Sequence, residues 1–103
     1  MSTNENLNKS IILKSLQSQS EQIKPFGVKR LALFGSFLRE DFDSESDIDI
    51  LVEFYKKTFD NYMDLKFFLE DFFHHKVDLV IADSLKPELK DIILREAVYV
   101  EGI

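Results

Sequence analysis

The sequence predicts an α/β (α+β) domain with a small mixed β-sheet and helices packed mainly on one face. Three observations support this class. Helix-like and strand-like segments alternate along the chain. Hydrophobic residues make up 45% of the 103 residues and include ten Phe, which is enough to fill one core. No repeat, low-complexity tract or linker divides the chain, so we expect a single domain over residues 1–103.

The N-terminal part of the chain predicts a helix, a strand and a short second helix. The first helix is expected over about Asn6 to Ile23, and a run of Gln and Ser dilutes its apolar face towards the C-terminal end. That face consists of Leu7, Ile11, Leu13, Leu16 and Ile23. Pro25-Phe26-Gly27 interrupts the helical pattern and begins a strand over Val28 to Phe34. A short helical stretch is expected near Phe37 to Glu40.

The C-terminal part predicts two more strands, two helices and an edge strand. After a polar loop, the second strand is expected over Asp49 to Phe54 and the third over Val77 to Ile81. Between them, Asp60 to Phe73 has the apolar spacing of a helix that covers one face of the sheet. A last helix is expected over Pro87 to about Ala97, and Val98 to Val100 could form an edge strand. The expected inward-facing residues of the two helices are Leu65, Phe68, Leu69, Phe72, Leu89, Ile92 and Ile93.

The net charge of −6 is concentrated in one segment. Residues 40–53 carry seven acidic side chains and no basic one, whereas basic residues slightly outnumber acidic ones elsewhere. A concentrated negative cluster suits divalent cations, which in turn attract the phosphates of a nucleotide. No basic stripe of the kind that nucleic-acid binding requires is visible. We therefore expect a protein or a small molecule as the acceptor, and not a nucleic acid.

The acidic segment follows a Gly-Ser turn. Gly35 and Ser36 come directly after the first predicted strand, where backbone N–H groups at the start of a helix can bind an anion. Asp47 and Asp49 lie at the head of the second strand, and side chains two positions apart in a strand point to the same face. We expect both carboxylates to converge beside a phosphate-binding turn. Arg39, one helical turn after Ser36, is expected within reach of the same phosphates.

Such a pair of carboxylates suits nucleotidyl transfer, in which an acceptor oxygen attacks the α-phosphorus of a nucleoside triphosphate and pyrophosphate leaves. Two divalent metal ions can stabilise the charge on the attacking and leaving oxygens. Asp47 and Asp49 are the candidate ligands of two Mg²⁺ ions, and Mn²⁺ seeks the same oxygen ligands. Asp78, a charged residue in the otherwise apolar third strand, is the candidate third ligand and would help to deprotonate the acceptor.

Gly35-Ser36, the ten-residue spacer 37–46 and Asp47-Ile48-Asp49 together resemble the signature of the nucleotidyltransferase superfamily of the DNA polymerase β type. The brevity of the chain narrows the resemblance to the minimal nucleotidyltransferases, including the MntA-type antitoxins that pair with HEPN-domain toxins. The likeness covers about residues 28–100 and implies a nucleotidyltransferase-like fold. In the enzymes that this chain resembles, the third acid comes from the strand after the intervening helix, which is the place of Asp78.

The resemblance implies an enzyme that transfers AMP from ATP to a partner protein, a HEPN-type toxin, which is modified on a tyrosine and so silenced. Many minimal members carry Ala-Arg-Gly where this chain has Leu38-Arg39-Glu40. This difference leaves open a non-catalytic antitoxin that acts by occlusion alone. An enzyme that modifies a small molecule, such as an aminoglycoside, is also left open, and a homodimer would then complete its pocket.

Other features concern the cellular environment. The chain has no cysteine, so it can form neither a disulfide framework nor a thiolate metal site. Its first residues lack the basic start and apolar block of a signal peptide, and no apolar run approaches membrane length. We expect a cytoplasmic protein without membrane contact. His74 and His75 end a predicted helix and are expected to face the helix dipole or solvent, not a metal.

Overall fold

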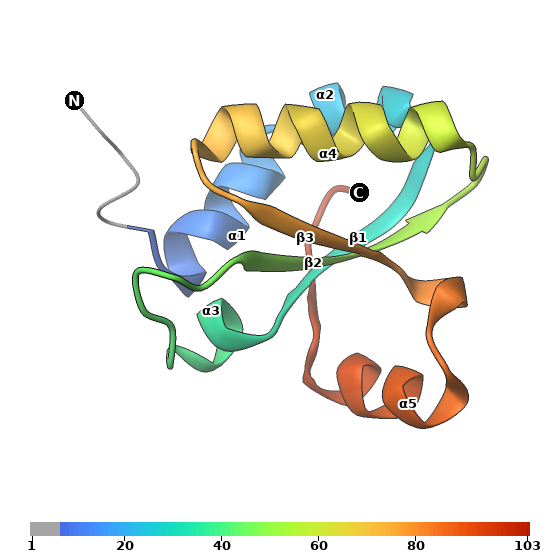
Figure 1. The fold of residues 1–103 in the computed structure, drawn as a ribbon. Coiled ribbons are helices and arrows are strands. Elements are labelled where there is room, and N and C mark those ends of the chain that lie inside the picture. The colour runs from blue at the N-terminus through green and yellow to red at the C-terminus, as the bar shows by residue number, and fades with distance from the viewer. Residues whose placement is uncertain (1–6) are drawn as a thin grey trace.

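A four-stranded mixed sheet organises the computed structural model, which describes residues 7–103 (Figure 1). The strands are β1 (Val28–Phe34), β2 (Ile48–Phe54), β3 (Val77–Ile81) and β4 (Val98–Tyr99). Their order across the sheet is β3-β2-β1-β4. β1 is antiparallel to β2 and to β4, whereas β2 and β3 are parallel. The predicted mixed sheet is confirmed, and the C-terminal segment forms its short edge strand as expected.

Helices cover one face of this sheet heavily and the other face lightly. The main core joins α1 (Lys9–Ser18), α2 (Ser20–Ile23) and α4 (Phe59–Phe73) to alternate residues of β1, β2 and β3. On the opposite face, α5 (Pro87–Glu96) packs over a small cluster of Ala32, Phe34, Leu51 and Ala82. The prediction that helices pack mainly on one face is therefore confirmed.

The long helix α4 follows its predicted pattern closely. The Thr58 hydroxyl caps its N-terminus by accepting a hydrogen bond from the Asn61 N–H at 3.0 Å. Leu65 and Leu69 are fully buried, whereas the other two predicted inward residues, at positions 68 and 72, are half-buried against the core. Among residues 7–103 no helix has the length and apolar character needed to cross a membrane.

The first predicted helix is divided in two at Gln19, which separates α1 from α2. Its expected start at Asn6 lies outside the described residues. α1 begins at Lys9 because the Asn8 side chain caps it by accepting a hydrogen bond from the N–H of the third helical residue at 3.0 Å. The polar run that weakened the predicted apolar face thus coincides with a break in the helix.

The buried face of α1 differs from the predicted one by one position. Ile11 was expected to face inward but is 38% exposed, whereas Ile12 is completely buried. Ile12 lies one helical turn before the buried Leu16, so these two side chains share a face. The predicted burial of Leu7 and Ile23 is confirmed.

The inward face of α5 is also predicted wrongly. Leu89 and Ile92 are 49% and 60% exposed, and only Ile93 among the three expected inward residues packs against the sheet. Leu94 and Ala97 complete this contact. α5 contacts the small cluster through one side of its C-terminal half, so Leu89 in the first turn does not reach the sheet. Ile92, three residues later, lies on the same exposed side of the helix as Leu89.

Candidate active site

Gly35 lies against the side chain of Asp49. β1 ends at Phe34, which is paired with Asp49 on β2, and Gly35 then adopts φ 79° and ψ −155° before α3 (Ser36–Arg39) begins. A Cβ added to Gly35 would lie 2.8 Å from the Asp49 Cγ atom and 2.9 Å from its Cβ atom. The positive φ and this close approach each require glycine. The Gly-Ser turn therefore touches one of the two predicted carboxylates directly.

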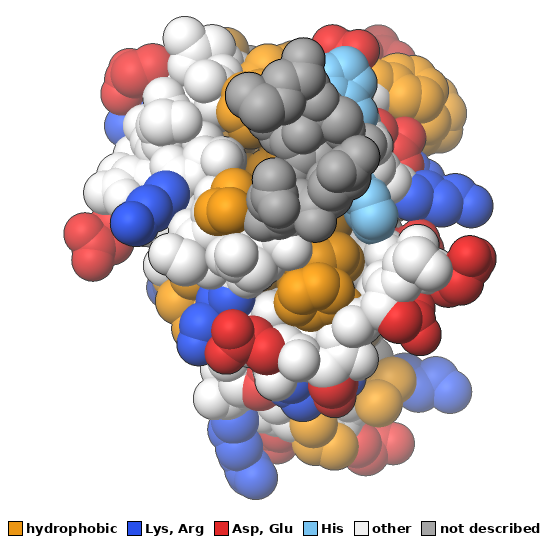
Figure 2. Space-filling model, turned by 90° about the vertical axis from the view of Figure 1, so that its left-hand side faces the viewer, with side chains coloured by type: hydrophobic (Ala, Val, Ile, Leu, Met, Phe, Trp, Pro, Cys, Tyr) orange, Lys and Arg blue, Asp and Glu red, His pale blue; other side chains and the backbone are white. Residues whose placement is uncertain are grey.

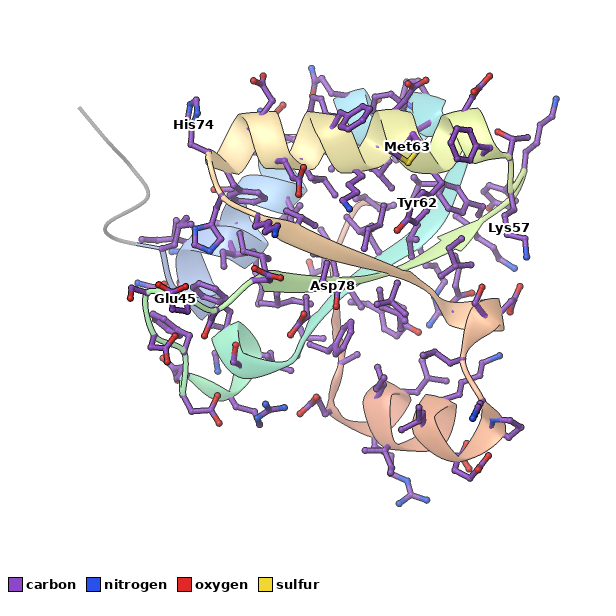
Figure 3. All side chains as sticks on the ribbon, in the orientation of Figure 1. Glu45, Lys57, Tyr62, Met63, His74 and Asp78 are labelled. Atoms are coloured by element: carbon purple, nitrogen blue, oxygen red, sulfur yellow. The ribbon has the colours of Figure 1, made fainter. Side chains whose placement is uncertain are left out.

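Asp47, Asp49 and Asp78 lie at the same end of neighbouring strands. Asp49 and Asp78 are paired positions in the parallel ladder of β2 and β3, and Asp47 comes one residue before β2. Val77 and Leu79 point into the main core, so the alternation of β3 directs Asp78 to the other face. Asp78 is solvent-exposed, and Figure 3 shows it on the side of the sheet where α3 and α5 lie.

Burial and the negative charges of Asp78 and Asp47 affect the pKa of Asp49. The pKa of Asp49 is raised from its ordinary 3.8 to about 6, mainly by burial and then by the negative charges of Asp78 and Asp47. A backbone hydrogen bond from Ser36 and the positive charge of Arg39 act in the opposite direction. The site thus holds negative charge that its own residues do not balance, and a divalent cation would relieve it.

The donor set fits a hard divalent cation. All three candidate ligands offer carboxylate oxygens, which Mg²⁺ and Mn²⁺ prefer. Within the described part of the chain, no group of three or more His, Cys, Asp or Glu side chains is placed to hold a metal ion together. Mg²⁺ keeps several waters and commonly uses only one or two carboxylates of the protein. An ion of this kind would need only one or two of the three candidate carboxylates.

A hydrogen-bonded turn fixes the loop that leads into Asp47. The Asp43 N–H donates to the Ser46 hydroxyl at 3.0 Å, and the Glu45 N–H donates to Asp43 Oδ1 at 2.8 Å. His75 Nε2 lies 2.7 Å from the Ser46 carbonyl oxygen. The expectation that His75 faces only the helix dipole or solvent is therefore wrong, because its ring holds this loop. Figure 2 shows both histidines, in pale blue, at the surface of this side of the molecule.

Arg39 is bound by acidic side chains. Its Nη1 donates to Glu96 Oε1 at 3.0 Å and its Nε donates to Asp41 Oδ2 at 3.3 Å. The Gly35 N–H donates to Glu96 Oε2 at 3.3 Å. The hydrogen bonds that Arg39 donates, first to Glu96 and then to Asp41, raise its pKa. Sequence analysis missed Glu96, whose only signal is an acid at the end of the last predicted helix.

The two departures from the family pattern have separate structural effects. Leu38 is half-buried and packs against the main core. Glu40 ends α3 in a left-handed conformation with φ 65°, a region in which glycine is favoured. Leu38 therefore adds packing, whereas Glu40 places a side chain on a residue whose backbone suits glycine.

Two surface depressions lie apart from the carboxylates. One is lined by Lys57, Thr58, Phe59, Tyr62 and Ile81, and the other by Glu70, His74, His75 and Lys76. Figure 3 shows Lys57 and Tyr62 at the opposite end of α4 from His74, with Asp78 below the sheet. Neither depression includes the three candidate carboxylates.

The sequence matches a family of known enzymes. The model of the family described as "Nucleotidyltransferase domain" matches residues 9–100. A candidate protein adenylyltransferase of Methanocaldococcus jannaschii is 47% identical over 75 residues, which cover 72% of this chain and 81% of that protein. The protein adenylyltransferase MntA of Thermococcus cleftensis is 40% identical over 76 residues, which cover 73% of this chain and 77% of that protein.

The fold also matches solved structures. A candidate minimal nucleotidyltransferase aligns with a TM-score of 0.73 and 31% identity, over 90% of this chain and 96% of that one. A chain from the complex of a tri-AMPylated Shewanella oneidensis HEPN toxin with an MNT antitoxin aligns with a TM-score of 0.62 and 20% identity. That alignment covers 88% of this chain and 73% of the other. The predicted nucleotidyltransferase-like fold is confirmed.

Proposed function

Because this chain belongs to the nucleotidyltransferase domain family, we propose that it transfers AMP from ATP to a partner protein, a HEPN-type toxin, in a magnesium-dependent reaction. The observation that carries this proposal is the position of Asp49, which contacts the Gly35 turn and is paired with Asp78. The turn supplies donors for phosphate, and the paired acids supply ligands for a cation and an acceptor for a proton. One small surface then contains the groups that nucleotidyl transfer needs.

Each residue has a role in the proposed reaction. Asp47 and Asp49 would hold Mg²⁺, which when bound stabilises negative charge on the attacking and leaving oxygens. The N–H of Gly35, together with Ser36, would bind the β- and γ-phosphates and so orient the α-phosphorus towards the acceptor. Asp78 would accept the proton of the acceptor hydroxyl as the oxygen attacks and pyrophosphate leaves.

A protein acceptor suits the exposure of this site. Asp78 is open to solvent, so a hydroxyl on the surface of another protein could reach its carboxylate. Two relatives of this chain bear the name protein adenylyltransferase, one of them as a candidate, which supports AMP as the transferred group. The similarity of fold to the complex of an MNT antitoxin with an AMPylated HEPN toxin supports a toxin as the acceptor.

Label transfer from ATP tests this function. The purified chain is incubated with Mg²⁺ and a cognate HEPN partner, or with lysate of the source cells, and with ATP labelled on the α-phosphate or on the γ-phosphate. Only nucleotidyl transfer leaves the α-label on the acceptor. We expect a labelled protein band from α-labelled ATP that is absent with Asp47→Asn/Asp49→Asn protein and in the presence of EDTA.

The other outcomes exclude the proposal in different ways. A band from γ-labelled ATP alone would indicate phosphoryl transfer. If no protein is labelled but the double variant still neutralises the partner, the chain acts by occlusion. Asp71→Asn, which removes an exposed carboxylate on α4, is the matched control and should leave the label unchanged.

A further inference from the structure

We propose that the Glu96 carboxylate competes with the triphosphate of the substrate for the Gly35 amide and for Arg39. When the triphosphate binds, it displaces the carboxylate from both groups. This inference rests on the proposed function, because it concerns the same phosphate-binding groups. It assigns to the end of α5 a role in setting how strongly the site binds a triphosphate relative to a monophosphate.

The carboxylate of Glu96 is hydrogen-bonded to two of the three predicted phosphate-binding residues, Gly35 and Arg39. Its Oε1 accepts a hydrogen bond from Arg39 Nη1 at 3.0 Å, and its Oε2 lies 3.3 Å from the same nitrogen. Oε2 also accepts a hydrogen bond from the Gly35 N–H at 3.3 Å. A phosphate group offers the same kind of anionic oxygens to the same donors. Glu96 and a phosphate therefore cannot use these hydrogen bonds at the same time.

Hydrogen bonds of the neighbouring residues hold the backbone of Glu96 close to the turn. The next residue, Ala97, donates its N–H to the Ile93 carbonyl at 2.9 Å. β4 then pairs with β1 through Val98 and Leu33, two residues before Gly35. Displacement therefore requires only a change of side-chain rotamer, and the displaced charge stays near the incoming phosphates.

The contact is weak enough for a triphosphate to replace it. The Arg39 side chain is 52% exposed and that of Glu96 is 27% exposed, and ion pairs with such access to water contribute little to stability. A triphosphate brings several negative charges and more acceptor oxygens than one carboxylate. The hydrogen bonds and the charge of the triphosphate therefore favour its replacing the carboxylate. The negative charge of Glu96, which stays nearby, weakens the binding of the triphosphate. A monophosphate does not reach the donors of the β- and γ-phosphates and should not sense Glu96.

Calorimetric titration of the full chain tests the competition. AMP-PNP with Mg²⁺ and, separately, AMP are titrated at pH 7.5 into the wild type, Glu96→Gln and Glu88→Gln. Glu88 is an exposed acid in the first turn of α5, so its variant makes the same change of charge away from the turn. We expect Glu96→Gln to bind AMP-PNP about three- to tenfold more tightly, from the loss of one nearby like charge. The affinity for AMP and both affinities of Glu88→Gln should stay within about twofold of the wild type.

Each result decides the question. Unchanged or weaker binding of AMP-PNP by Glu96→Gln would overturn the inference, and weaker binding would make Glu96 the residue that positions Arg39. Tighter binding of AMP-PNP and AMP alike would also overturn it, because the effect would be general electrostatics.

If neither the wild type nor the variants bind AMP-PNP, both this inference and the proposed function fail. If the wild type binds and transfers AMP but Glu96→Gln shows no gain, only this inference fails. Glu96→Ala repeats the test if the Gln variant does not fold by circular dichroism.

Discussion

Asp49 and Asp78 occupy paired positions of the parallel strands β2 and β3, so two carboxylates lie side by side in the sheet. Like charges on neighbouring strands destabilise a sheet unless something compensates for them. Here burial and the charges of Asp78 and Asp47 raise the pKa of Asp49 to about 6. The arrangement therefore places a charge at a cost to stability, which is common at sites that bind a cation or move a proton.

The stability of the protein should depend on pH through Asp49. Because its pKa is higher in the folded state, the folded protein binds more protons than the unfolded chain between about pH 4 and pH 6. The contribution of Asp49 to the free energy of unfolding must then fall as pH rises through this range. In urea unfolding with EDTA, we expect Asp49→Asn to gain about 1–2 kcal/mol relative to the wild type between pH 4 and pH 7. This gain is smaller than the free energy that corresponds to the full pKa shift, because Asp49 is partly exposed and water screens its interactions.

The control for this titration is Asp71→Asn, in which an exposed carboxylate on α4 is neutralised. The difference in stability between Asp71→Asn and the wild type should stay constant from pH 4 to pH 7. The difference between Asp49→Asn and the wild type should change over this range. A constant difference between Asp49→Asn and the wild type from pH 4 to pH 7 would contradict the raised pKa.

Gly35→Ala should damage both the fold and the site. The new Cβ would meet the Asp49 side chain, and alanine disfavours φ 79°. We expect a loss of about 2–4 kcal/mol in the free energy of unfolding, measured by urea denaturation, and no binding of AMP-PNP. Gly102→Ala is the matched control, since Gly102 has φ 91° but its added Cβ would lie 3.7 Å from the nearest side chain. Equal losses in the two variants would show that contact with Asp49 is unimportant.

Local patterns in the sequence were sufficient to predict the three longer strands of the sheet. Asp78 was singled out as a charge in an otherwise apolar strand, and in the structure it is exposed between the buried Val77 and Leu79. The bounds of β3 were predicted as observed, because a short apolar run lies between polar segments. The Gly-Ser turn was predicted beside Asp49, since β1 and β2 bring their ends together.

Interactions between distant parts of the chain could not be predicted in this way. Glu96 contacts Gly35 across 61 residues and Arg39 across 57, and no local spacing indicates either contact. The exposure of Leu89 and Ile92 also depends on tertiary structure, because an amphipathic pattern does not specify which part and which side of a helix reach the sheet. The role of His75 depends in the same way on a loop 29 residues earlier.

Glu40→Gly should stabilise the protein. Glu40 has φ 65°, a conformation that costs residues with a Cβ about 1 kcal/mol or more relative to glycine. Its ion pair with Lys9, at 3.9 Å, is exposed and contributes little. After the greater flexibility of glycine in the unfolded chain is allowed for, we expect a gain of about 0.5–1 kcal/mol, or about 3–6 °C in Tm by calorimetry. Glu40→Ala keeps the Cβ and should bring no such gain; a similar gain in that variant would mean that charge, and not backbone conformation, is responsible.

His75→Ala should reduce the rate of AMP transfer strongly and the free energy of unfolding only slightly. The variant removes the hydrogen bond to the Ser46 carbonyl and the edge-on contact of the ring with Phe37, whose centroid lies 5.6 Å away. Ser46 directly precedes Asp47, so a looser carbonyl lets that carboxylate move, and small displacements of reacting groups are costly. We expect transfer to fall about tenfold and the Mg²⁺ concentration for half-maximal rate to rise, with a loss of about 1 kcal/mol in the free energy of unfolding.

Two further variants separate this role of His75 from a general effect on folding. His75→Gln can still donate a hydrogen bond to the Ser46 carbonyl and should recover part of the Mg²⁺ dependence. His74→Asn changes the neighbouring histidine, which ends α4 with φ 50°, to a residue that tolerates this conformation. It should leave both transfer and Mg²⁺ dependence near the wild type. If the Mg²⁺ dependence is the same in His75→Ala and the wild type, the loop does not position Asp47, and the loss of transfer must come from reduced stability alone.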